Sequence, residues 1–313
     1  PHDRVDLLWK KESGAPSELF VDSIDRWNLV MAADDGITIP MASDDGVMVE
    51  GVVEVKGDGV FSGHLVVNRL LENFFPRCNI EWAFEEGDFV SEGSRVLSII
   101  GPSESVLCSE RILLNIIGRM SGISTRTAEW ANEMGKIRVA CTRKTGWGIL
   151  DKWAVNVGGG LTHRLSRKDS LMIKENDLLS VGSDFQNEEL AISLVMSKID
   201  MDLNADFTVF EVRSAEQAIT ATSEWAKIQE IRGGQERLVL LLDNMGHEGC
   251  SKTHSILKKL GLRKWCIIEG SGGITSENRS EWSRCDGIEL ISTSSINRGV
   301  PPLDFSMIVS RVE

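Results

Sequence analysis

The feature that most constrains this chain is a series of six short apolar segments between residues 136 and 293: KIRVACT, SLMIKE, FTVFEV, RLVLLLD, KWCIIEG and GIELIST. Most are separated by stretches with helical spacing of apolar residues, such as EELAISLVMSKI. Such alternation predicts parallel strands, and continuously apolar strands are buried on both faces. Six strands are fewer than a complete eightfold barrel contains. We therefore expect an incomplete, distorted α/β barrel, with a doubly wound sheet as the rival architecture.

Residues 46–101 have a different pattern. Short β-rich runs alternate there with turns around one helical segment, HLVVNRLLENFF. Gly-Asp and Glu-Gly turns between half-apolar runs are typical of hairpins. Helical spacing resumes from Ser109 onward. This region therefore predicts a small α+β domain that precedes the barrel.

The bulk composition excludes some classes of partner. The formal net charge is −13 and the pI is about 5.0, which argues against a surface that binds nucleic acid or anionic lipid. No segment has the ~18 apolar residues of a membrane span, and the first residues lack a signal-peptide core. We expect a cytoplasmic protein. Its six cysteines show no metal-binding spacing and are expected to be reduced, packed thiols.

Polar residues follow every predicted strand at its carboxyl end, which is the reactive edge of barrels and open α/β sheets. In chain order they are Arg143 with Lys144, Lys174, Glu211 with Arg213, Asp243 with Asn244, Glu269 with Ser271, and Ser292 to Ser295.

Arg143 and Lys144 come shortly after the apolar run Val139–Cys141, although desolvating an unpaired cation is costly. One explanation is a set of mutual salt bridges that cap the core, with Glu211 and Asp243 as partners. The cations of this rim outnumber those two acids, so we favour an external anion as the partner. These cations are Arg143, Lys144, His163, Arg164 and Lys174.

The last two strands are followed by residues that suit a phosphate. EGSGGITSEN places Ser271, Gly272 and Gly273 between a strand and an expected helix start, where backbone amides and a helix N-terminus attract anions. STSSINRG supplies hydroxyl groups, among them Ser292 and Ser294, and a cation at Arg298. A phosphate site at the final two strands is common in barrels.

Several motifs, in this order, resemble those of the quinolinate phosphoribosyltransferase family, the carboxylating nicotinate-nucleotide pyrophosphorylases. They are SERILLNIIGRMSGIST, TRKTGWGILDKWAVNVGGGLTHR, LMIKEND, FEVRSAEQA, LLLDNM, IEGSGGI and PPLDF. The resemblance implies an N-terminal α/β sandwich domain, residues 1–112, and a barrel domain, residues 113–296. The C-terminal tail, residues 297–313, is expected to pack against the sandwich domain. It also implies a homodimer or a dimer-based higher oligomer.

The resemblance further implies the reaction and its residues. Quinolinate and 5-phosphoribosyl 1-pyrophosphate would react with Mg2+ to give nicotinate mononucleotide, pyrophosphate and carbon dioxide. Arg143, His163, Arg164 and Lys174 would hold the quinolinate carboxylates, with Arg111 supplied across the dimer. Lys144, Glu211 and Asp243 would be catalytic, facing ribose, pyrophosphate and metal, with Glu211 and Asp243 as metal ligands. Ser271, Gly272, Gly273, Ser292 and Ser294 would bind phosphate.

Other interpretations of single residues stay open. His163 could simply hydrogen-bond a carbonyl at a strand end, and Arg111 could pair with Glu110 or another surface acid. Arg119, Arg167 and Lys168 are expected to be solvated surface charges.

The chain also departs from the family pattern. Asp177 and Arg298 stand where the family has histidine, and Ser294 lies near a usual glycine. Alternatives within the fold are a nicotinate-specific transferase and a paralogue associated with molybdenum transport. From another class, the chain could be a non-catalytic anion-binding homologue.

Overall fold

The computed structural model of the chain describes residues 2–179 and 188–312. Contacts divide the chain into two compact units. The barrel unit comprises Pro1–Arg4, Ala131–Arg143 and Leu161–Ser295, and the sandwich unit comprises Val5–Trp130, Lys144–Gly160 and Ile296–Glu313. The domain boundaries expected from the sequence stay a prediction.

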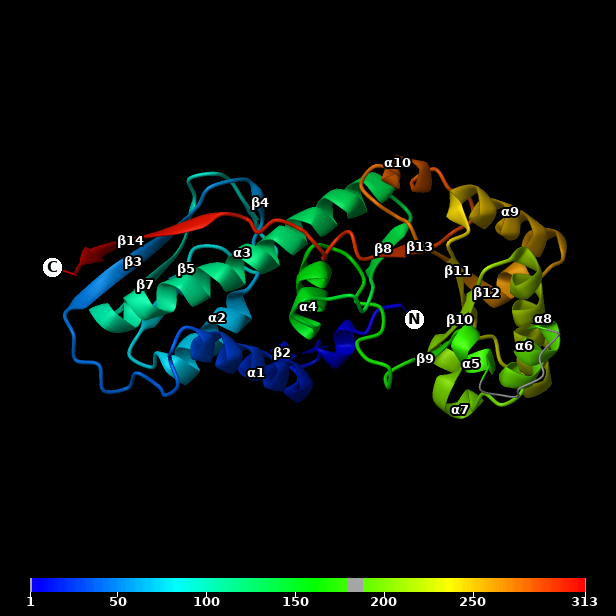
Figure 1. The fold of residues 1–313 in the computed structure, drawn as a ribbon, viewed down its shortest axis with the longest axis horizontal. Helices are drawn as coiled ribbons and strands as arrows, with labels where there is room; N and C mark the ends of the chain where they lie inside the picture. The colour runs from blue at the N-terminus through cyan, green and yellow to red at the C-terminus, as the bar shows by residue number, and fades with distance from the viewer. Residues whose placement is uncertain (1, 180–187, 313) are drawn as a thin grey trace. The chain divides into compact units, whose positions relative to one another are not determined.

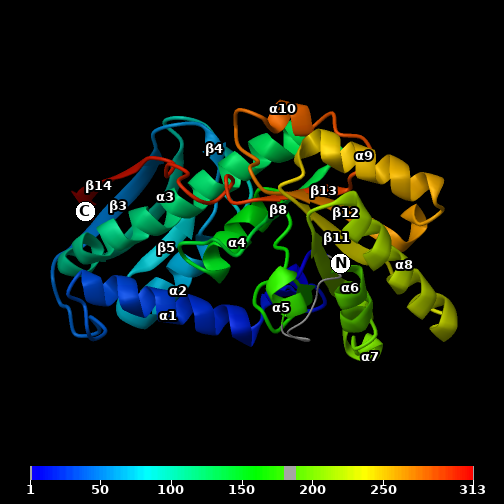
Figure 2. The same cartoon turned by 45° about the vertical axis from the view of Figure 1, so that its right-hand side comes forward.

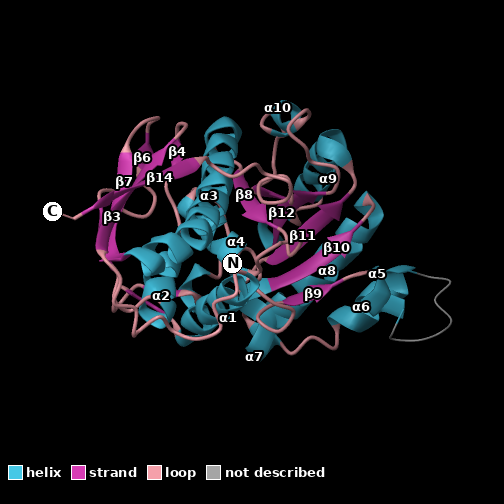
Figure 3. Cartoon of the chain, turned by 60° about the vertical axis from the view of Figure 1, so that its left-hand side comes forward, coloured by secondary structure: helices cyan, strands magenta, loops and turns pink. Residues whose placement is uncertain are grey.

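The barrel unit contains one six-stranded sheet in which every neighbouring pair is parallel. Its order is β8 (Arg138–Cys141), β13 (Leu290–Thr293), β12 (Cys266–Ser271), β11 (Leu238–Asp243), β10 (Thr208–Val212) and β9 (Leu171–Ile173). Figure 3 shows β9 to β12 side by side. All six strands predicted from the apolar segments are confirmed.

The strand order separates the two architectures. β8, the first strand of this sheet in sequence, pairs with β13, the last, and from β13 to β9 each strand neighbours the next in sequence. A doubly wound sheet would instead reverse its order at a switch point. One further parallel bridge joins Ala140 of β8 to Leu161, beyond the edge of the sheet. The expected incomplete barrel is confirmed, and its opening lies between Leu161 and β9.

Helices cover the outer face of this sheet, as Figure 2 shows for α6 (Glu188–Met196), α8 (Ala215–Arg232) and α9 (Gly246–Lys259). Ser214 caps α8 by accepting a hydrogen bond from the Gln217 N–H, which satisfies one donor of the first turn. Two apolar clusters fill the unit, one around Phe207 and Val239 and another around Ala140 and Ile267. The short elements are α5 (Glu175–Leu179), α7 (Met201–Asn204), η2 (Ala205–Phe207), η3 (Arg263–Trp265) and α10 (Arg279–Trp282).

The sandwich unit is built on an antiparallel sheet in the order β14 (Phe305–Arg311), β3 (Met48–Val55), β7 (Arg95–Pro102) and β5 (Asn79–Trp82). Figure 1 shows β14, from the end of the chain, alongside β3. Its helices are α1 (Glu18–Asp34), α2 (His64–Phe74), α4 (Ile149–Val157) and most of α3 (Ser103–Met134). Its small elements are η1 (Val5–Leu7), β1 (Trp9–Lys10), β2 (Ala15–Pro16), β4 (Gly59–Val60) and β6 (Phe89–Val90).

The six cysteines are free thiols, and five of them are buried. Burial raises the pKa of Cys78 and Cys266 to about 11 and that of Cys250 to about 12. Thiols with such pKa values are almost wholly protonated at neutral pH and react slowly. Within the described ranges, no helix has the length and apolar character needed to cross a membrane.

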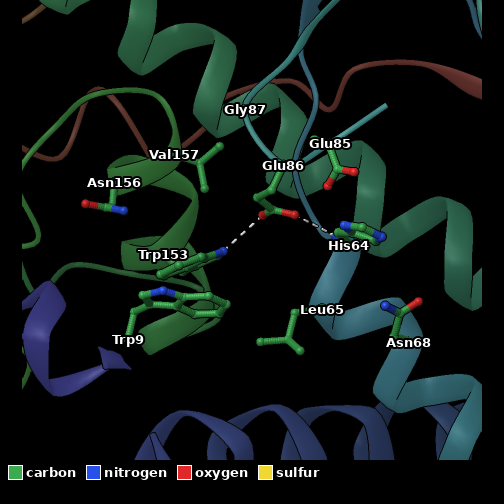
Figure 4. A pocket seen from close by; sticks show the side chains of 10 residues that line it. All are labelled: Trp9, His64, Leu65, Asn68, Glu85, Glu86, Gly87, Trp153, Asn156 and Val157. Carbon is green, nitrogen blue, oxygen red and sulfur yellow. Dashed lines mark hydrogen bonds between the residues drawn. The ribbon is translucent and has the colours of Figure 1, made fainter. Parts of the chain in front are cut away.

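Helix α2 begins with a carboxylate cap that comes from a distant loop (Figure 4). Gly63, the residue before the helix, has no side chain to satisfy the first N–H groups. Glu86 does so instead, accepting from the N–H of His64 at 2.8 Å and from that of Gly63 at 3.1 Å. It also accepts from Ser62 Oγ at 2.8 Å and from Trp153 Nε1 at 3.0 Å, which ties α2 to α4. The negative charge also suits the positive end of the helix dipole.

We expect Glu86→Ala to destabilise the protein, because it leaves these donors without an acceptor. Leaving a buried donor unpaired costs about 1–3 kcal/mol, measurable as a lower urea midpoint. Glu85→Ala is the matched control, since the Glu85 side chain is exposed. Equal stability of the two variants would contradict the capping role.

Candidate active site

The carboxyl ends of the barrel strands gather most of the predicted site residues. These are Arg143, His163, Arg164, Lys174, Glu211, Asp243, Ser271, Gly272, Gly273, Ser292 and Ser294, all in the barrel unit. Arg111 and Lys144 belong to the sandwich unit. Their part in the site stays a prediction.

Arg164 is a buried cation without a carboxylate partner. It is 6% exposed, and its guanidinium lies 3.4 Å from the carbonyl oxygen of Ser170 and 3.1 Å from Met172 Sδ. Neither of these groups carries a negative charge. Burial lowers the pKa of Arg164 and repulsion from Arg143 lowers it further, whereas attraction to the carboxylates of Asp169 and Asp177 raises it. In the part of the chain that the structure describes, no carboxylate forms an ion pair with Arg164.

Arg143 adds a second guanidinium to the same place. Its side chain is exposed, and no described residue forms an ion pair with it. Two arginines that repel each other are stabilised by a shared anion, and the planar fork of each matches a carboxylate or phosphate. The expected excess of positive charge is therefore present at these two side chains.

Lys174 and Glu211 form a close ion pair, so the other charges at this edge are partly balanced within the protein. Asp243 accepts a hydrogen bond from Asn244 Nδ2 at 2.8 Å, and its Oδ2 lies 3.9 Å from Arg213 Nε. Arg213 also pairs with Glu175. Salt bridges thus account for part of the rim, as the alternative explanation held, but they do not reach Arg143 or Arg164.

Both ring nitrogens of His163 have partners inside the protein. Nδ1 accepts from the Arg164 N–H at 2.8 Å, and Nε2 lies 3.1 Å from Glu269 Oε2. A direct contact from His163 to a substrate carboxylate would therefore require one of these bonds to break. Glu269 is one of the predicted strand-end acids but is not among the predicted site residues. The sequence signal that could identify it is a charged residue within the apolar run of β12.

Asp177, one of the departures from the family pattern, has a structural role. Its carboxylate accepts from the Lys174 N–H at 2.9 Å, while its own N–H donates to the Lys174 carbonyl at 2.8 Å. This reciprocal pair closes the first turn of α5. The acid therefore helps to hold the backbone of Lys174.

The glycine-rich turn after β12 is formed, and a helix start follows the segment as expected. α10 begins at Arg279, and Asn278 precedes it. Asn278 also closes the intervening turn, donating to the Gly273 carbonyl and accepting from the Thr275 N–H. Backbone amides of the turn remain as the phosphate ligands to be expected.

Gly272 and Gly273 have left-handed backbone conformations, with φ of +88° and +63°. A Cβ on Gly272 would lie 2.3 Å from Asn244 Oδ1, whereas one on Gly273 would meet nothing within 4 Å. Hydroxyl groups lie beside the turn: Ser292 Oγ donates to Ser271 Oγ at 3.2 Å. Ser294 is half-buried, and Arg298, in the sandwich unit, is exposed.

Arg111 lies on α3 and is exposed. It lines a cavity of about 370 Å³ in the sandwich unit, together with Arg119, Trp147 and Asp304. No described residue forms an ion pair with Arg111, so the expected alternative pairing with Glu110 is absent from the described structure.

Arg119 was expected to be a solvated charge, and this expectation is wrong. Its Nε and Nη2 donate to the two carboxylate oxygens of Asp151 at 3.0 and 2.9 Å, and the guanidinium lies 5.0 Å from the ring centre of Trp147. Asp151, which is 1% exposed, also accepts from the Gly146 N–H at 2.8 Å. The loop that carries Lys144 is further held by Asn297, whose Nδ2 donates to the Lys144 carbonyl at 3.0 Å. Arg119 therefore helps to shape this loop.

A second cavity in the sandwich unit, of about 530 Å³, is the one that Glu86 lines (Figure 4). The rings of Trp9 and Trp153 lie 5.6 Å apart at its edge. Because the Glu86 carboxylate already accepts several hydrogen bonds, it is not available as an acid or base there. This cavity is therefore the weaker candidate for catalysis.

A metal would need ligands beyond those that the protein supplies here. The described residues contain no group of three histidine, cysteine or acidic side chains that could hold a metal ion. Mg2+ commonly takes one or two carboxylates together with substrate phosphates. Glu211 and Asp243, at neighbouring strands, fit a Mg2+ ion that arrives with a phosphorylated substrate.

Comparison with known proteins decides the family. The family model described as "Quinolinate phosphoribosyl transferase, C-terminal domain" matches residues 123–308, and that of the N-terminal domain matches residues 36–121. The chain belongs to the quinolinate phosphoribosyl transferase family.

Relatives and solved structures agree with this assignment. The chain is 34% identical over 267 residues to a probable nicotinate-nucleotide pyrophosphorylase [carboxylating] of Archaeoglobus fulgidus, covering 83% of this chain and 94% of the relative. It is 35% identical over 260 residues to the corresponding protein of Methanothermobacter thermautotrophicus, covering 80% of this chain and 85% of the relative. The crystal structure of NadC from Streptococcus pyogenes matches with a TM-score of 0.73 at 26% identity, covering 94% and 96% of the two chains. A quinolinate phosphoribosyl transferase was the family expected from the motifs, and that prediction is confirmed.

In this quinolinate phosphoribosyl transferase family member, we expect Gly272→Ala to destabilise the turn after β12. The new Cβ would collide with Asn244, and the left-handed backbone would be strained, at a cost of about 1–3 kcal/mol. Gly273→Ala, the matched control, carries only the cost of the left-handed backbone, because the space around it is open. Denaturant unfolding of both variants measures the difference. A Gly272 variant as stable as the Gly273 variant would contradict the steric account.

Proposed function

We propose that this protein transfers the phosphoribosyl group of 5-phosphoribosyl 1-pyrophosphate to quinolinate with decarboxylation, giving nicotinate mononucleotide, pyrophosphate and carbon dioxide. The observation that carries the proposal is Arg164, a buried guanidinium beside Arg143 with which no described carboxylate forms an ion pair. Quinolinate brings two adjacent carboxylates, so one substrate molecule can satisfy both arginines. Membership of the family and the names of its relatives support the same reaction.

We assign the quinolinate carboxylates to Arg143 and Arg164, with Lys174 beside them. A bidentate arginine fixes the plane of a carboxylate as well as its position. The pyridine ring is then oriented with its nitrogen toward the ribose. Such orientation is a large part of catalysis when two substrates must meet.

The first chemical step breaks the bond between the ribose carbon and the pyrophosphate oxygen, and the electron pair leaves with pyrophosphate. The ribose carbon gains positive character as this happens. The carboxylates of Glu211 and Asp243 lie at the neighbouring ends of β10 and β11, where they would stabilise that charge. Glu211 and Asp243 would also be the residues to hold Mg2+, which would supply positive charge to the leaving pyrophosphate. Lys144 would contribute in the same way.

The pyridine nitrogen then bonds to the ribose carbon and becomes positively charged. The carboxylate next to that nitrogen leaves as carbon dioxide, and its bonding electrons remain on the ring carbon, stabilised by the adjacent cationic nitrogen. A proton from water completes the product. During this step the protein holds the remaining carboxylate and the ring, so the arginines act by positioning.

The ribose 5-phosphate is assigned to the turn of Ser271, Gly272 and Gly273 with the hydroxyl groups of Ser292 and Ser294. The open space over Gly273 supports a close approach of phosphate to the backbone. The exposed Arg111 supports a homodimer, or a dimer-based higher oligomer, in which it reaches the site of a second copy. The cytoplasmic location stays a prediction from the sequence.

We expect the protein to form nicotinate mononucleotide and carbon dioxide from quinolinate and 5-phosphoribosyl 1-pyrophosphate when Mg2+ is present. Nicotinate in place of quinolinate should give little product, because its single carboxylate leaves one guanidinium unpaired. Chromatography of the nucleotide and trapping of labelled carbon dioxide measure both. Product from nicotinate alone would favour a nicotinate-specific transferase. No product from either substrate would favour a non-catalytic homologue or the transport-associated paralogue.

We expect Arg143→Ala to lower kcat/KM for quinolinate by about 100-fold, as loss of one partner of a charge pair does. Its thermal unfolding should not change, because the side chain is exposed. Arg167→Ala is the matched control: this nearby cation is also exposed and lies 3.7 Å from Asp177. Unfolding of the Arg143 variant, or equal activity of the two variants, would contradict the assignment.

A further inference from the structure

Glu269 is a charged residue in the middle of the barrel sheet. It lies in β12, between Leu241 of β11 and Leu290 of β13, and is fully buried. An ionised carboxylate at such a place is costly unless its hydrogen bonds compensate. The family assignment gives it no role, since it touches neither the predicted phosphate turn nor the two arginines in any described contact.

Glu269 does contact His163, and this contact determines which ring nitrogen of His163 carries the proton. The backbone N–H of Arg164 can only donate, so His163 Nδ1, at 2.8 Å, accepts and carries no proton. In the neutral ring the proton is then on Nε2, which donates to Glu269 Oε2 at 3.1 Å. His163 therefore links a buried carboxylate to the backbone of Arg164.

The backbone at this point needs such support. His163 has φ of +52°, a left-handed conformation that is unfavourable for a residue with a side chain. Its N–H donates to the His2 carbonyl at 2.9 Å. Arg164 comes next, and the described hydrogen bonds of its guanidinium go to a carbonyl and a thioether. The direction in which Arg164 leaves the backbone thus depends on the orientation of the His163 ring.

We infer that Glu269 is a positioning residue for the dicarboxylate substrate: it holds His163 as the Nε2–H tautomer, and His163 in turn fixes Arg164. His163 acts through Arg164 and does not touch the substrate. The identity of the substrate in this inference rests on the proposed function. The tautomer of His163 does not depend on it.

Other groups that face Glu269 agree with a carboxylate there. His2 Nε2 lies 3.5 Å from the same oxygen, and the rings of His2 and His163 both pack against Phe207. Burial, the strongest influence, would raise the pKa of Glu269, but His163, through attraction and its hydrogen bond, and the nearby His2 together lower it. Burial lowers the pKa of His2, so this ring is neutral at pH 7. Within the described residues, Glu269 Oε1 has no hydrogen-bond partner.

Glu269→Leu leaves the His163 Nε2–H without an acceptor, so some loss of stability is expected whatever the role of Glu269. A purely structural role and a positioning role differ in what else they predict for Glu269→Leu. The structural role predicts a change in stability alone. The positioning role predicts a change in the His163 ring and in quinolinate binding.

The first measurement is the tautomer of His163 by ¹⁵N NMR of protein labelled at its five histidines. We expect a single Nε2–H form in the wild type and in Glu269→Gln, whose amide oxygen can still accept. Glu269→Leu should give a mixture of tautomers. Glu281→Leu is the matched control, because it removes another carboxylate from a histidine, His247 at 3.3 Å, on the surface of the same unit.

The second measurement is steady-state kinetics. We expect Glu269→Leu to raise KM for quinolinate about tenfold, the size expected for one lost hydrogen bond to a charged group. The KM for 5-phosphoribosyl 1-pyrophosphate should stay within twofold. Glu269→Gln should lie between this variant and the wild type, and Glu281→Leu should match the wild type.

A folded Glu269→Leu variant that keeps the Nε2–H form would overturn the inference, and so would equal rises in both KM values. If Glu269→Leu does not fold, the Gln variant decides: the Nε2–H form together with a raised KM for quinolinate alone supports the inference, whereas unchanged KM values overturn it. Absence of turnover in the wild type would instead count against the proposed function. The NMR measurement of the His163 tautomer does not depend on turnover.

Discussion

The charge on Arg164 is the constraint on which the rest of the site depends. A guanidinium that is 6% exposed loses most of its hydration, and no carboxylate among the described residues forms an ion pair with it, although Asp169 and Asp177 attract it. Its neighbour Arg143 makes the imbalance worse. The unpaired charges make the folded protein without ligand less stable. Binding of an anion with two carboxylates would offset this loss. The same imbalance would favour a dicarboxylate over a monocarboxylate. A single carboxylate would pair with one guanidinium and leave the other unpaired.

The sheet makes this concentration of charge possible. Parallel strands bring their carboxyl ends to one edge, so residues far apart in sequence, such as Arg143 and Asp243, share an edge without any local signal. This much could be predicted from the sequence, because continuous apolar runs mark the strands and their last residues are easily identified. The choice of a barrel over a doubly wound sheet needed the pairing of β8 with β13, which no local pattern encodes.

The sequence was less informative where a side chain finds its partner through tertiary structure. Arg119 lies on an amphipathic helix and looked solvated, but Asp151, 32 residues away, takes both of its donors. Glu269 was visible as an acid in an apolar run, yet its link to His163 spans 106 residues. In each case the residue type suggested that the side chain has a role, but the sequence did not indicate which residue is its partner.

The charges at the edge of the sheet differ in how readily they can change partner. Lys174, with a side chain that is 43% exposed, pairs with Glu211, and pairs near the surface contribute about 0–1 kcal/mol. Under the proposed function, separation of this pair would free Glu211 for a ribose cation or for Mg2+ and Lys174 for a carboxylate. Among the described residues Arg164 has no ion-pair partner to exchange, and its backbone N–H donates to His163. The proposed site would thus combine one fixed anchor for the substrate with charges that can change partner.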